Sequence, residues 1–302
     1  MKFSIIIPNY NGAALLEDCI KSLGLSNELI IIDNGSKDNS LKKINELKHS
    51  LKIKNCKLII NQTNYGFAAA VNQGIKAAKY NYVVIANNDL VIDKNWFKYI
   101  SQAIKKYPKV ACFCGIVLNK SGTKYESAGL KFFYSGKCQN LKNGEKFIRA
   151  DTPVSPYYVW GSSAALVVYQ KSVLEKIGFF DEDFFAYEED VDLALRLDKF
   201  GYKTLLVPQA ISYHLGGGTS SKMGNLRQIN DFSNWIFIII KNFSFKEIFL
   251  NFPQIIYQRL INFIVIPHKS IKIFRRLKLI PKMLKKRQEL QNLLKSSHDH
   301  WY

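Results

Sequence analysis

Short apolar segments alternate with segments of helical periodicity over the first 118 residues, and this alternation limits the fold more than any other feature of the sequence. The strand candidates are short, rich in Ile and Val, and lie at residues 3–7, 29–32, 57–60 and 82–86. The helix candidates between them are residues 13–23, 39–48 and 67–79. Strands and helices that alternate at this spacing predict βαβ units and a mostly parallel sheet flanked by helices.

A polar cluster follows each of the four strand candidates. The clusters are rich in Asn and Asp and lie at residues 9–12, 33–36, 61–64 and 87–89. Asn and Asp are ordinary turn formers, so a turn explains any one cluster by itself. In a parallel sheet, however, the four strand ends lie along one edge, and open α/β folds bind their ligands at that edge. The sequence therefore predicts a ligand site there.

The side chains at the strand ends suggest a nucleotide as the ligand. The Asp33 carboxylate matches the N3–H donor of a uracil or thymine ring. Asp89 offers the carboxylate oxygen that Mg²⁺ or Mn²⁺ prefers when it also binds phosphate oxygens. The first strand is not followed by GxGxxG, and the chain has no GxxxxGK[ST] loop, which argues against dinucleotide and P-loop sites.

Carboxylates crowd at residues 188–192, where four of the five side chains are acidic. A helix N-terminus favours acidic residues and explains part of this cluster. Mutual repulsion raises the pKa of some members, which suits a general base. Asp190 shares a helical face with Leu193 and Leu197, so we expect it near the helix start on the buried side.

Two other groups of potential ligands give weaker signals. His214, before the glycines at 216–218, is a candidate for a metal ligand or a phosphate contact, although a single His is more often structural. Cys112 and Cys114 form a CxC pair, but the five cysteines include no CxxC. Buried free thiols in a reducing cytosol are the preferred interpretation.

Six segments in order resemble the successive blocks of glycosyltransferase family 2. They are SIIIPNYNG, IIIDNGSKDNS, NYGFAAAVNQG, VVIANNDLVID, FFDEDFFAYEEDVDLALR and YHLGGGTS, which together run from residue 3 to about residue 220. Within the family they are most similar to the bacterial rhamnosyltransferase-like branch. The resemblance implies a GT-A fold, which is a Rossmann-like α/β fold, together with a nucleotide-diphospho-sugar donor, Mg²⁺ or Mn²⁺, and inversion at the anomeric carbon.

The resemblance also implies roles on the donor side of the site. The residues that it places around the nucleotide are Pro8, Tyr10, Asp33, Asn64, Gly66 and Asn72. Asp89 takes the place of the last Asp of the family's metal-binding DxD motif, and His214 falls where a His near the metal is common. Asn87 stands in place of the first Asp of that motif, so its expected role is a hydrogen bond to the ribose or to a water on the metal.

On the acceptor side, the resemblance implies a catalytic base. Asp190 takes the place of the base in the family's Glu-Asp motif, with Glu189 beside it. Trp160 and Gly161 fall in the loop that faces the acceptor. Asp190 would then remove the proton from an acceptor hydroxyl as that oxygen attacks the sugar.

The basic charge is concentrated in the last part of the chain. The protein has 43 Lys and Arg against 24 Asp and Glu, a net charge of +19. Residues 222–302 carry fifteen basic and four acidic residues, so +11 of this charge lies there, mixed with Ile, Phe, Leu and Trp. We therefore divide the chain into a GT-A domain at 1–221 and a basic amphipathic helical extension at 222–302. Prolines at 253, 267 and 281 predict that the extension is divided into short helices.

Basic amphipathic helices suit an anionic membrane surface, with packing on the enzyme domain or on another subunit as the alternative. No run of about 18 uncharged apolar residues is present, so we expect no transmembrane helix. The predicted location is the cytoplasmic face of the cytoplasmic membrane, with peripheral attachment. The oligomeric state stays open, and a nucleic-acid partner is not expected.

The predicted function is transfer of a sugar from a dTDP- or UDP-sugar to a glycan or lipid-linked acceptor in cell-surface polysaccharide synthesis. Rhamnose is the first expectation, with UDP-hexose or galactofuranose as the alternative. A nucleotidyltransferase would carry a Gly- and Arg-rich signature near the N-terminus, which GAALLEDC does not supply. A basic membrane-binding scaffold would explain the charged extension but not the ordered polar strand ends.

Overall fold

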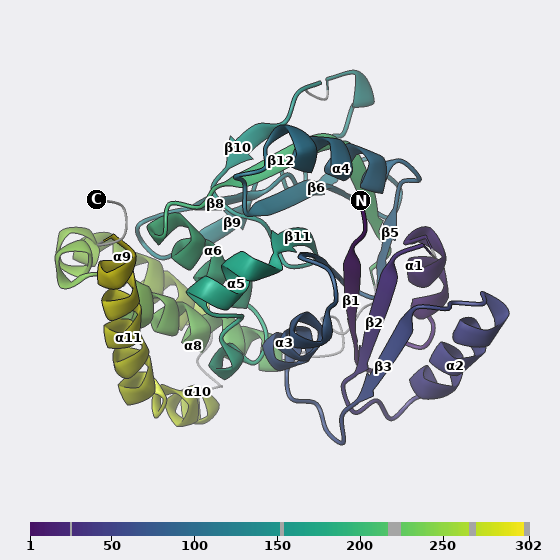
Figure 1. Ribbon diagram of the computed structural model, residues 1–302. Coiled ribbons are helices and arrows are strands. Elements are labelled where there is room, and N and C mark those ends of the chain that lie inside the picture. The colour runs from purple at the N-terminus through teal and green to yellow at the C-terminus, as the bar shows by residue number, and fades with distance from the viewer. Residues whose placement is uncertain (25, 152–153, 217–224, 266–269, 299–302) are drawn as a thin grey trace.

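The four strands predicted near the N-terminus are parallel neighbours within one ten-stranded sheet (Figure 1). The computed structural model describes residues 1–24, 26–151, 154–216, 225–265 and 270–298. The parallel strands lie in the order β4–β1–β2–β3. Their bounds are β1 Ser4–Asn9, β2 Glu28–Asp33, β3 Cys56–Ile60 and β4 Tyr82–Ala86. The predicted parallel sheet of βαβ units is confirmed for this part of the chain.

Helices cover both faces of the sheet, which explains why its strands are apolar throughout rather than alternating. In β1, Ile5 and Ile7 pack with one helical layer, whereas Ile6 packs with the other. The first layer consists of α1 (Leu16–Ser22), α2 (Ser40–Ser50) and α4 (Trp96–Lys106). The second consists of α3 (Phe67–Ala77), α5 (Lys171–Ile177) and α6 (Glu189–Lys199).

Strands from the second half of the GT-A region extend the sheet beyond β4 in the order β11, β6, β12, β10. β11 is antiparallel to β4 and β6, whereas β12 is parallel to β6. The long strand β12 carries His214 to the edge where the four parallel strands end. The bounds are β5 Leu90–Ile92, β6 Cys112–Asn119, β7 Tyr125–Ser127, β8 Leu130–Phe132, β9 Cys138–Asn140, β10 Tyr157–Val159, β11 Leu166–Gln170 and β12 Thr204–His214, with short 3-10 helices η1 Arg149–Asp151 and η2 Glu182–Phe184.

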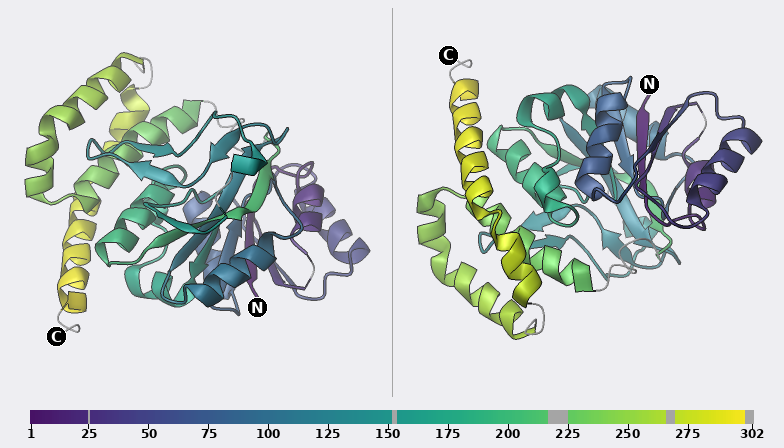
Figure 2. Two further views of the ribbon diagram at one scale, coloured as in Figure 1. Left: turned by 90° about the horizontal axis from the view of Figure 1, so that it is seen from above. Right: turned by 90° about the horizontal axis from the view of Figure 1, so that it is seen from below.

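The C-terminal extension is helical and lies on one side of the molecule, away from α1 and α2 (Figure 2). Its helices are α8 (Asn225–Asn242), α9 (Phe245–Val265), α10 (Ser270–Leu277) and α11 (Ile280–His298). The prediction that Pro253 separates two helices is wrong, because α9 continues through it. Pro253 is exposed, so water can solvate the carbonyl that loses its helical hydrogen bond. Pro281 lies in the first turn of α11, where no N–H is needed, and Pro267 lies outside the described residues.

One face of the extension packs on the GT-A domain. Phe237 and Ile238 of α8 and Met283 of α11 are fully buried in a cluster with Phe184 and Val191. The predicted boundary at 221/222 lies among residues 217–224, outside the described part. No helix in the described part of the chain is long and apolar enough to cross a membrane.

Several basic side chains of the extension point inward. Lys241 Nζ lies 2.7 Å from Asp181 Oδ2 and 2.8 Å from Asp192 Oδ1. Lys286 Nζ lies 2.5 Å from Asp183 Oδ2 and also pairs with Asp181. Part of the positive charge that the sequence analysis assigned to a membrane-facing surface is therefore neutralised inside the protein.

Candidate active site

The polar strand ends are joined to one another by hydrogen bonds. The amide of Asn9, at the end of β1, accepts from Asn88 Nδ2 at 2.7 Å and donates to Asp33 Oδ2 at 3.2 Å. Asn34 Oδ1 accepts from Asn61 Nδ2 at 2.9 Å. The predicted gathering of strand ends along one edge is thus confirmed. These buried amides hold the loops together, as turn-forming residues would, and Asn9, Asn34 and Asn88 also line a cavity.

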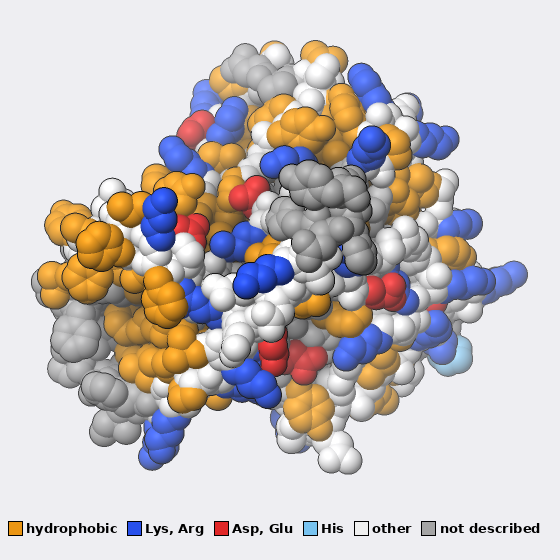
Figure 3. Space-filling model, turned by 60° about the vertical axis from the view of Figure 1, so that its left-hand side comes forward, with side chains coloured by type: hydrophobic (Ala, Val, Ile, Leu, Met, Phe, Trp, Pro, Cys, Tyr) orange, Lys and Arg blue, Asp and Glu red, His pale blue; other side chains and the backbone are white. Residues whose placement is uncertain are grey.

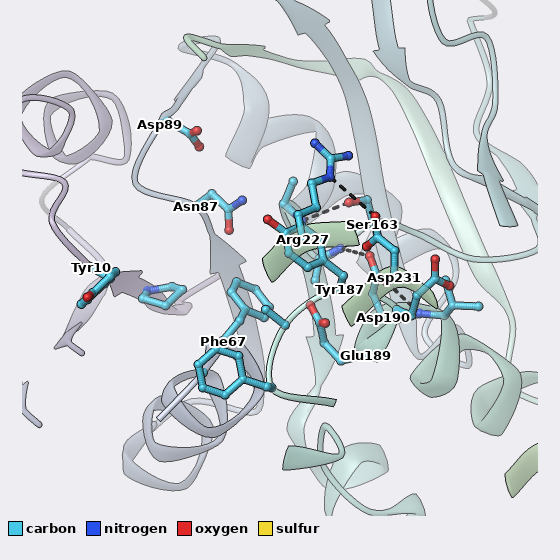
Figure 4. Close-up of a pocket in the computed structure, with 18 of the residues that line it drawn as sticks. Tyr10, Phe67, Asn87, Asp89, Ser163, Tyr187, Glu189, Asp190, Arg227 and Asp231 are labelled. Carbon is cyan, nitrogen blue, oxygen red and sulfur yellow. Dashed lines mark hydrogen bonds and ion pairs between the residues drawn. The ribbon is translucent and has the colours of Figure 1, made fainter. Parts of the chain in front are cut away.

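A cavity of about 450 Å³ lies over this edge. In Figure 4, Tyr10 lies at one end of it and Asp190 at the other, with Asn87 and Asp89 between them. Nine of the residues predicted from sequence line it: Pro8, Tyr10, Asn64, Gly66, Asn87, Asp89, Glu189, Asp190 and His214. The structure therefore brings together residues more than 200 positions apart in the chain.

Two residues assigned to the nucleotide side do not line the cavity. Asp33 is completely buried, and its carboxylate accepts from Asn9 Nδ2 and from the Ser36 backbone N–H at 3.0 Å. The Asn72 amide pairs with the backbone of Phe180, donating at 2.9 Å and accepting at 3.1 Å. Asp33 supports the first two strand ends, and Asn72 attaches α3 to the segment before the acidic cluster. Direct contact of either with a nucleotide stays a prediction.

Asp89 and His214 meet at the middle of the cavity. Asp89 Oδ2 lies 3.0 Å from His214 Nε2, and His214 Nδ1 lies 2.5 Å from Glu126 Oε2. The hydrogen bond to Asp89 is the main cause that raises the pKa of His214 to about 9, and the charge of Glu126 adds to it. Asp89 Oδ1 is buried and has no hydrogen-bond partner among the described residues. An oxygen in that state is suited to a ligand.

Glu189 and Asp190 begin α6 at the other end of the cavity. Burial, followed by the charge of Asp190, raises the pKa of Glu189 well above its usual range. Burial also raises the pKa of Asp190, but its carboxylate accepts from the backbone N–H groups of Ala164 at 3.0 Å and Val191 at 2.9 Å. Such bonds favour the ionised form. Asp190 is therefore the member of the pair that we expect to ionise first.

The predicted acceptor-side residues Trp160 and Gly161 lie behind the cavity wall. Trp160 stacks on Phe132, with ring centroids 4.7 Å apart. Gly161 accepts from the backbone N–H of Leu130, and a Cβ at Gly161 would lie 2.8 Å from Ala194 Cβ. Leu130 itself lines the cavity. Both residues thus support the wall, and their role toward an acceptor stays a prediction.

Four residues that the sequence analysis did not single out take part in the site: Glu126, Tyr187, Arg227 and Asp231. Arg227 is the only Lys or Arg among the described lining residues. Its guanidinium lies 5.5 Å from the Tyr187 ring centroid and 3.7 Å from Asp231. Arg227 and Asp231 lie on α8, in the predicted extension, where no sequence motif marks them. Glu126 is brought to His214 by the pairing of β7 and β12 with β6, which the sequence alone does not indicate.

The profile of Glycosyl transferase family 2 matches residues 4–178, more than half of the chain. The chain belongs to glycosyl transferase family 2. The match covers the strand ends and Asp89 but stops before Glu189 and Asp190. The assignment of the base therefore depends on the geometry of the cavity and not on the family match.

Known relatives of this family 2 protein were found by sequence and by structure. A poly-beta-1,6-N-acetyl-D-glucosamine synthase of Staphylococcus epidermidis is 29% identical over 218 residues, covering 70% of this chain and 49% of the relative. The chain thus spans about half the length of that curated relative. S. aureus TarS 1-349 in complex with UDP-GlcNAc has a TM-score of 0.59 at 16% identity, covering 100% of this chain and 91% of that chain. GalNAc-T7 with UDP, GalNAc and Mn²⁺ has a TM-score of 0.62 at 19% identity, covering 80% of this chain and 48% of that chain. These likenesses confirm the predicted GT-A fold.

Proposed function

We propose that this glycosyltransferase moves a sugar from a nucleoside diphosphate donor to a hydroxyl of a glycan or lipid-linked acceptor, with inversion, in cell-surface polysaccharide synthesis. One observation carries the proposal: a single cavity places Asp89 beside the strand ends and Asp190 at its far end. Transfer needs a site for the diphosphate and a base for the acceptor, and the cavity offers both. The relative named as a polymer synthase supports the polysaccharide setting.

Asp190 acts as the general base. The acceptor oxygen forms a bond to the anomeric carbon, its proton moves to Asp190, and the bond from that carbon to the diphosphate breaks. Attack from the face opposite the leaving group gives inversion. Glu189 stays protonated beside Asp190, so it adds no second negative charge where the proton must arrive.

The Asp89 carboxylate fits a divalent cation such as Mn²⁺, because its Oδ1 is buried without a protein partner among the described residues. His214 would join it as a ligand only where the cation displaces the proton that raises its pKa beside Asp89 and Glu126. The described residues contain no group of three His, Cys, Asp or Glu that could hold a metal alone, so donor phosphates would complete the coordination. Mn²⁺ in the GalNAc-T7 structure supports this assignment. A bound cation would supply positive charge to the leaving diphosphate.

Replacing Asp89 with Ala is expected to abolish the Mn²⁺ requirement of donor use. Wild-type protein should hydrolyse its donor sugar slowly without acceptor, and added Mn²⁺ should accelerate this and raise the Tm with UDP or dTDP present. Asp89→Ala should lose both responses because the buried oxygen ligand is gone. Asp93→Ala, on the same segment but outside the cavity lining, is the matched control. An unchanged Mn²⁺ requirement in Asp89→Ala would contradict the metal assignment.

The donor sugar is tested in the same assay. The relatives support a UDP-linked N-acetylhexosamine, since one is named for N-acetyl-D-glucosamine and another was solved with UDP-GlcNAc. The rhamnosyltransferase-like branch predicts dTDP-rhamnose instead. We propose UDP-N-acetylglucosamine as the donor, with dTDP-rhamnose and UDP-galactofuranose as the competing substrates. Faster hydrolysis of dTDP-rhamnose would overturn this choice in favour of the branch prediction.

We further propose that α9 attaches the enzyme to an anionic membrane. Hydrophobic side chains gather on the left of the face shown in Figure 3. Among the α9 side chains that the structure describes, the large exposed apolar ones, which we call the α9 stripe, are Phe245, Phe249, Leu250, Phe252, Ile256, Tyr257 and Leu260. Phe245 is 78% and Phe249 80% exposed. At 100° per residue the stripe occupies one continuous side of the helix.

Charge favours a membrane over a protein partner. The sector of the stripe includes Lys246 and no acidic residue. The only acidic residue of α9 is Glu247, which points elsewhere and accepts from the Ser244 N–H at 2.6 Å. Exposed basic side chains also lie on α10, on α11 and in the turn between them, at Arg275, Lys285 and Lys278 respectively. An aromatic apolar side with basic neighbours is typical of helices that lie in a membrane interface.

The double variant Phe249→Glu, Phe252→Glu should release the enzyme from vesicles that contain phosphatidylglycerol. Two carboxylates in the stripe remove apolar burial and repel anionic lipid, so bound protein should fall about 10-fold or more in co-sedimentation. Ile60→Glu, Tyr158→Glu is the matched control, because both residues are 59% exposed and lie on strands β3 and β10 rather than on α9. Unchanged vesicle binding in the α9 variant, or a dimer in light scattering that this variant dissociates, would refute membrane attachment by the stripe.

A further inference from the structure

The backbone that leads into Asp190 has a disfavoured conformation. Phe185, Tyr187 and Glu188 have positive φ values of 64°, 71° and 66°. Residues with a side chain rarely adopt this region, and three such residues within four positions persist only where their surroundings enforce the conformation. We call residues 184–188 the base loop, because Glu189 and Asp190 follow it directly.

One side chain of the C-terminal extension holds the base loop from behind. The two N–H groups of Asn234 Nδ2, on α8, are shared among the carbonyl oxygens of Phe184 at 2.9 Å, Ala186 at 3.0 Å and Tyr187 at 2.7 Å. Carbonyls only accept hydrogen bonds, so the nitrogen side of the amide must face them. Asn234 is 0% exposed, and water is therefore unable to replace these bonds.

A second side chain fixes the amide of Asn234. Arg276, on α10, donates from Nη2 to Asn234 Oδ1 at 2.6 Å and to the Phe184 carbonyl at 3.3 Å. Its Nε donates to Ser233 Oγ at 2.7 Å. The arginine therefore orients the amide and also contacts the base loop directly.

The opposite side of the base loop faces the cavity. Phe185 and Tyr187 line it, and the Phe185 carbonyl accepts from the Ala68 N–H at 3.3 Å. A Cβ at Gly66 would lie 2.5 Å from the same carbonyl, so the loop packs directly against the nucleotide side of the site. A shift of the loop would therefore move Asp190 relative to the donor.

We infer that Asn234 and Arg276, which we call the clamp, are positioning residues that hold the base loop so that Asp190 points at the acceptor. They touch no reacting atom. The kinetic part of this inference rests on the proposed transferase function, whereas the structural part does not. Misplacement of a reacting group by about 1 Å costs on the order of 100-fold in rate, so removal of the clamp should lower kcat more than donor affinity.

The experiment compares Asn234→Ala with Asn230→Ala. Asn230 lies one turn earlier on α8, is also 0% exposed, and its amide has no hydrogen-bond partner among the described residues. In Asn234→Ala, amide hydrogen exchange in residues 184–190 should accelerate at least about 10-fold. The kcat should fall about 10- to 100-fold, with Mn²⁺-dependent UDP affinity changed less than about 3-fold. Asn230→Ala should change neither quantity.

Arg276→Lys is the milder second variant, which keeps the charge but loses the planar fork, and its kcat should fall by about 3- to 10-fold. Unchanged exchange in the base loop of Asn234→Ala would overturn the clamp whatever the activity. Equal losses of kcat in Asn234→Ala and Asn230→Ala would show a general stability effect and overturn the positioning role. If the folded wild-type protein used no donor, the proposed function would be refuted but the clamp would not, because hydrogen exchange in the base loop tests the clamp without any activity.

Discussion

Replacing Asp190 with Asn is expected to lower the turnover number for sugar transfer by about 10²- to 10⁴-fold. The amide keeps the shape of the side chain but has no basic oxygen to receive the acceptor proton. Mn²⁺-dependent binding of UDP should survive, because Asp89, which His214 contacts, lies at another part of the cavity. Single-turnover kinetics and titration calorimetry separate the two effects. Wild-type turnover in this variant would end the assignment of Asp190 as base.

Glu189→Gln is the matched control, since glutamine has nearly the shape of the protonated glutamic acid that we assign at that position. It should retain turnover within about 10-fold.

The pH dependence of kcat/KM tests the assignment of Asp190 as base in a second way. Asp190 must be ionised to act, and burial raises its pKa, so kcat/KM should fall with decreasing pH at a higher pH than an ordinary aspartate would give. The titratable groups around the pair are Glu188, Asp231, Cys138 and Tyr169.

Replacing Lys241 with Met is expected to lower the free energy of unfolding at pH 7 by about 3–5 kcal/mol. Lys241 is 6% exposed and lies between Asp181 and Asp192, which are 4% and 0% exposed. Burial acts against ionisation of both aspartates, but Lys241 and its neighbouring cations hold their pKa values below the usual range. Without the ammonium, Asp192 keeps its ion pair with Arg196 and Asp181 keeps its ion pair with Lys286, so each buried carboxylate has lost one cation. Urea unfolding followed by circular dichroism measures the loss.

The pH dependence gives an independent check on Lys241. An acidic group whose pKa is lower in the folded than in the unfolded state stabilises the folded state at pH values above its ordinary pKa. This stabilisation is lost as the pH falls through the lowered pKa. The difference between wild type and Lys241→Met should therefore narrow as the pH falls below about 4, the ordinary pKa of aspartate, because the wild type then loses the stabilisation that its two lowered-pKa aspartates provide. Lys199→Met is the control, because Lys199 is partly exposed and 3.9 Å from Glu247, and its loss should cost about 1 kcal/mol or less. Equal losses in the two variants would contradict a buried ion-pair network.

The parts of the fold that follow local rules were predictable from sequence. Strand and helix periodicity gave the parallel sheet, and the polar ends of its strands indicated the edge that forms the cavity. Asp89 was expected there because it follows a recognisable strand, whereas helical periodicity placed Asp190 only at a helix start and the family resemblance assigned it to the site; both line the cavity. Asp33 shows the limit of this reasoning: the end of β2 was predicted, but the depth of its side chain below the cavity depends on Asn9 from another strand.

The remaining features depend on contacts between distant segments. Nothing in the neighbourhood of Asn234 or Arg276 indicates that they meet at the base loop. A count of charged residues also does not show which of them form ion pairs. Lys241 and Lys286 therefore contributed to a predicted basic surface, although they neutralise buried or half-buried aspartates. Pro253 was read as a helix end because the rule ignores that an exposed carbonyl can be solvated.

The dependence of the base loop on α8 and α10 has a consequence for the timing of protein synthesis. Domains generally fold from the N-terminus as the ribosome extends the chain. The sheet and Asp190 are synthesised well before Asn234 and Arg276, so a nascent chain could already hold a folded sheet and a donor pocket. Its base loop would not be held by both side chains until α8 and α10 had been made. We expect ribosome-bound chains that stop before α10 to bind nucleotide but to transfer sugar more slowly than chains that include α10.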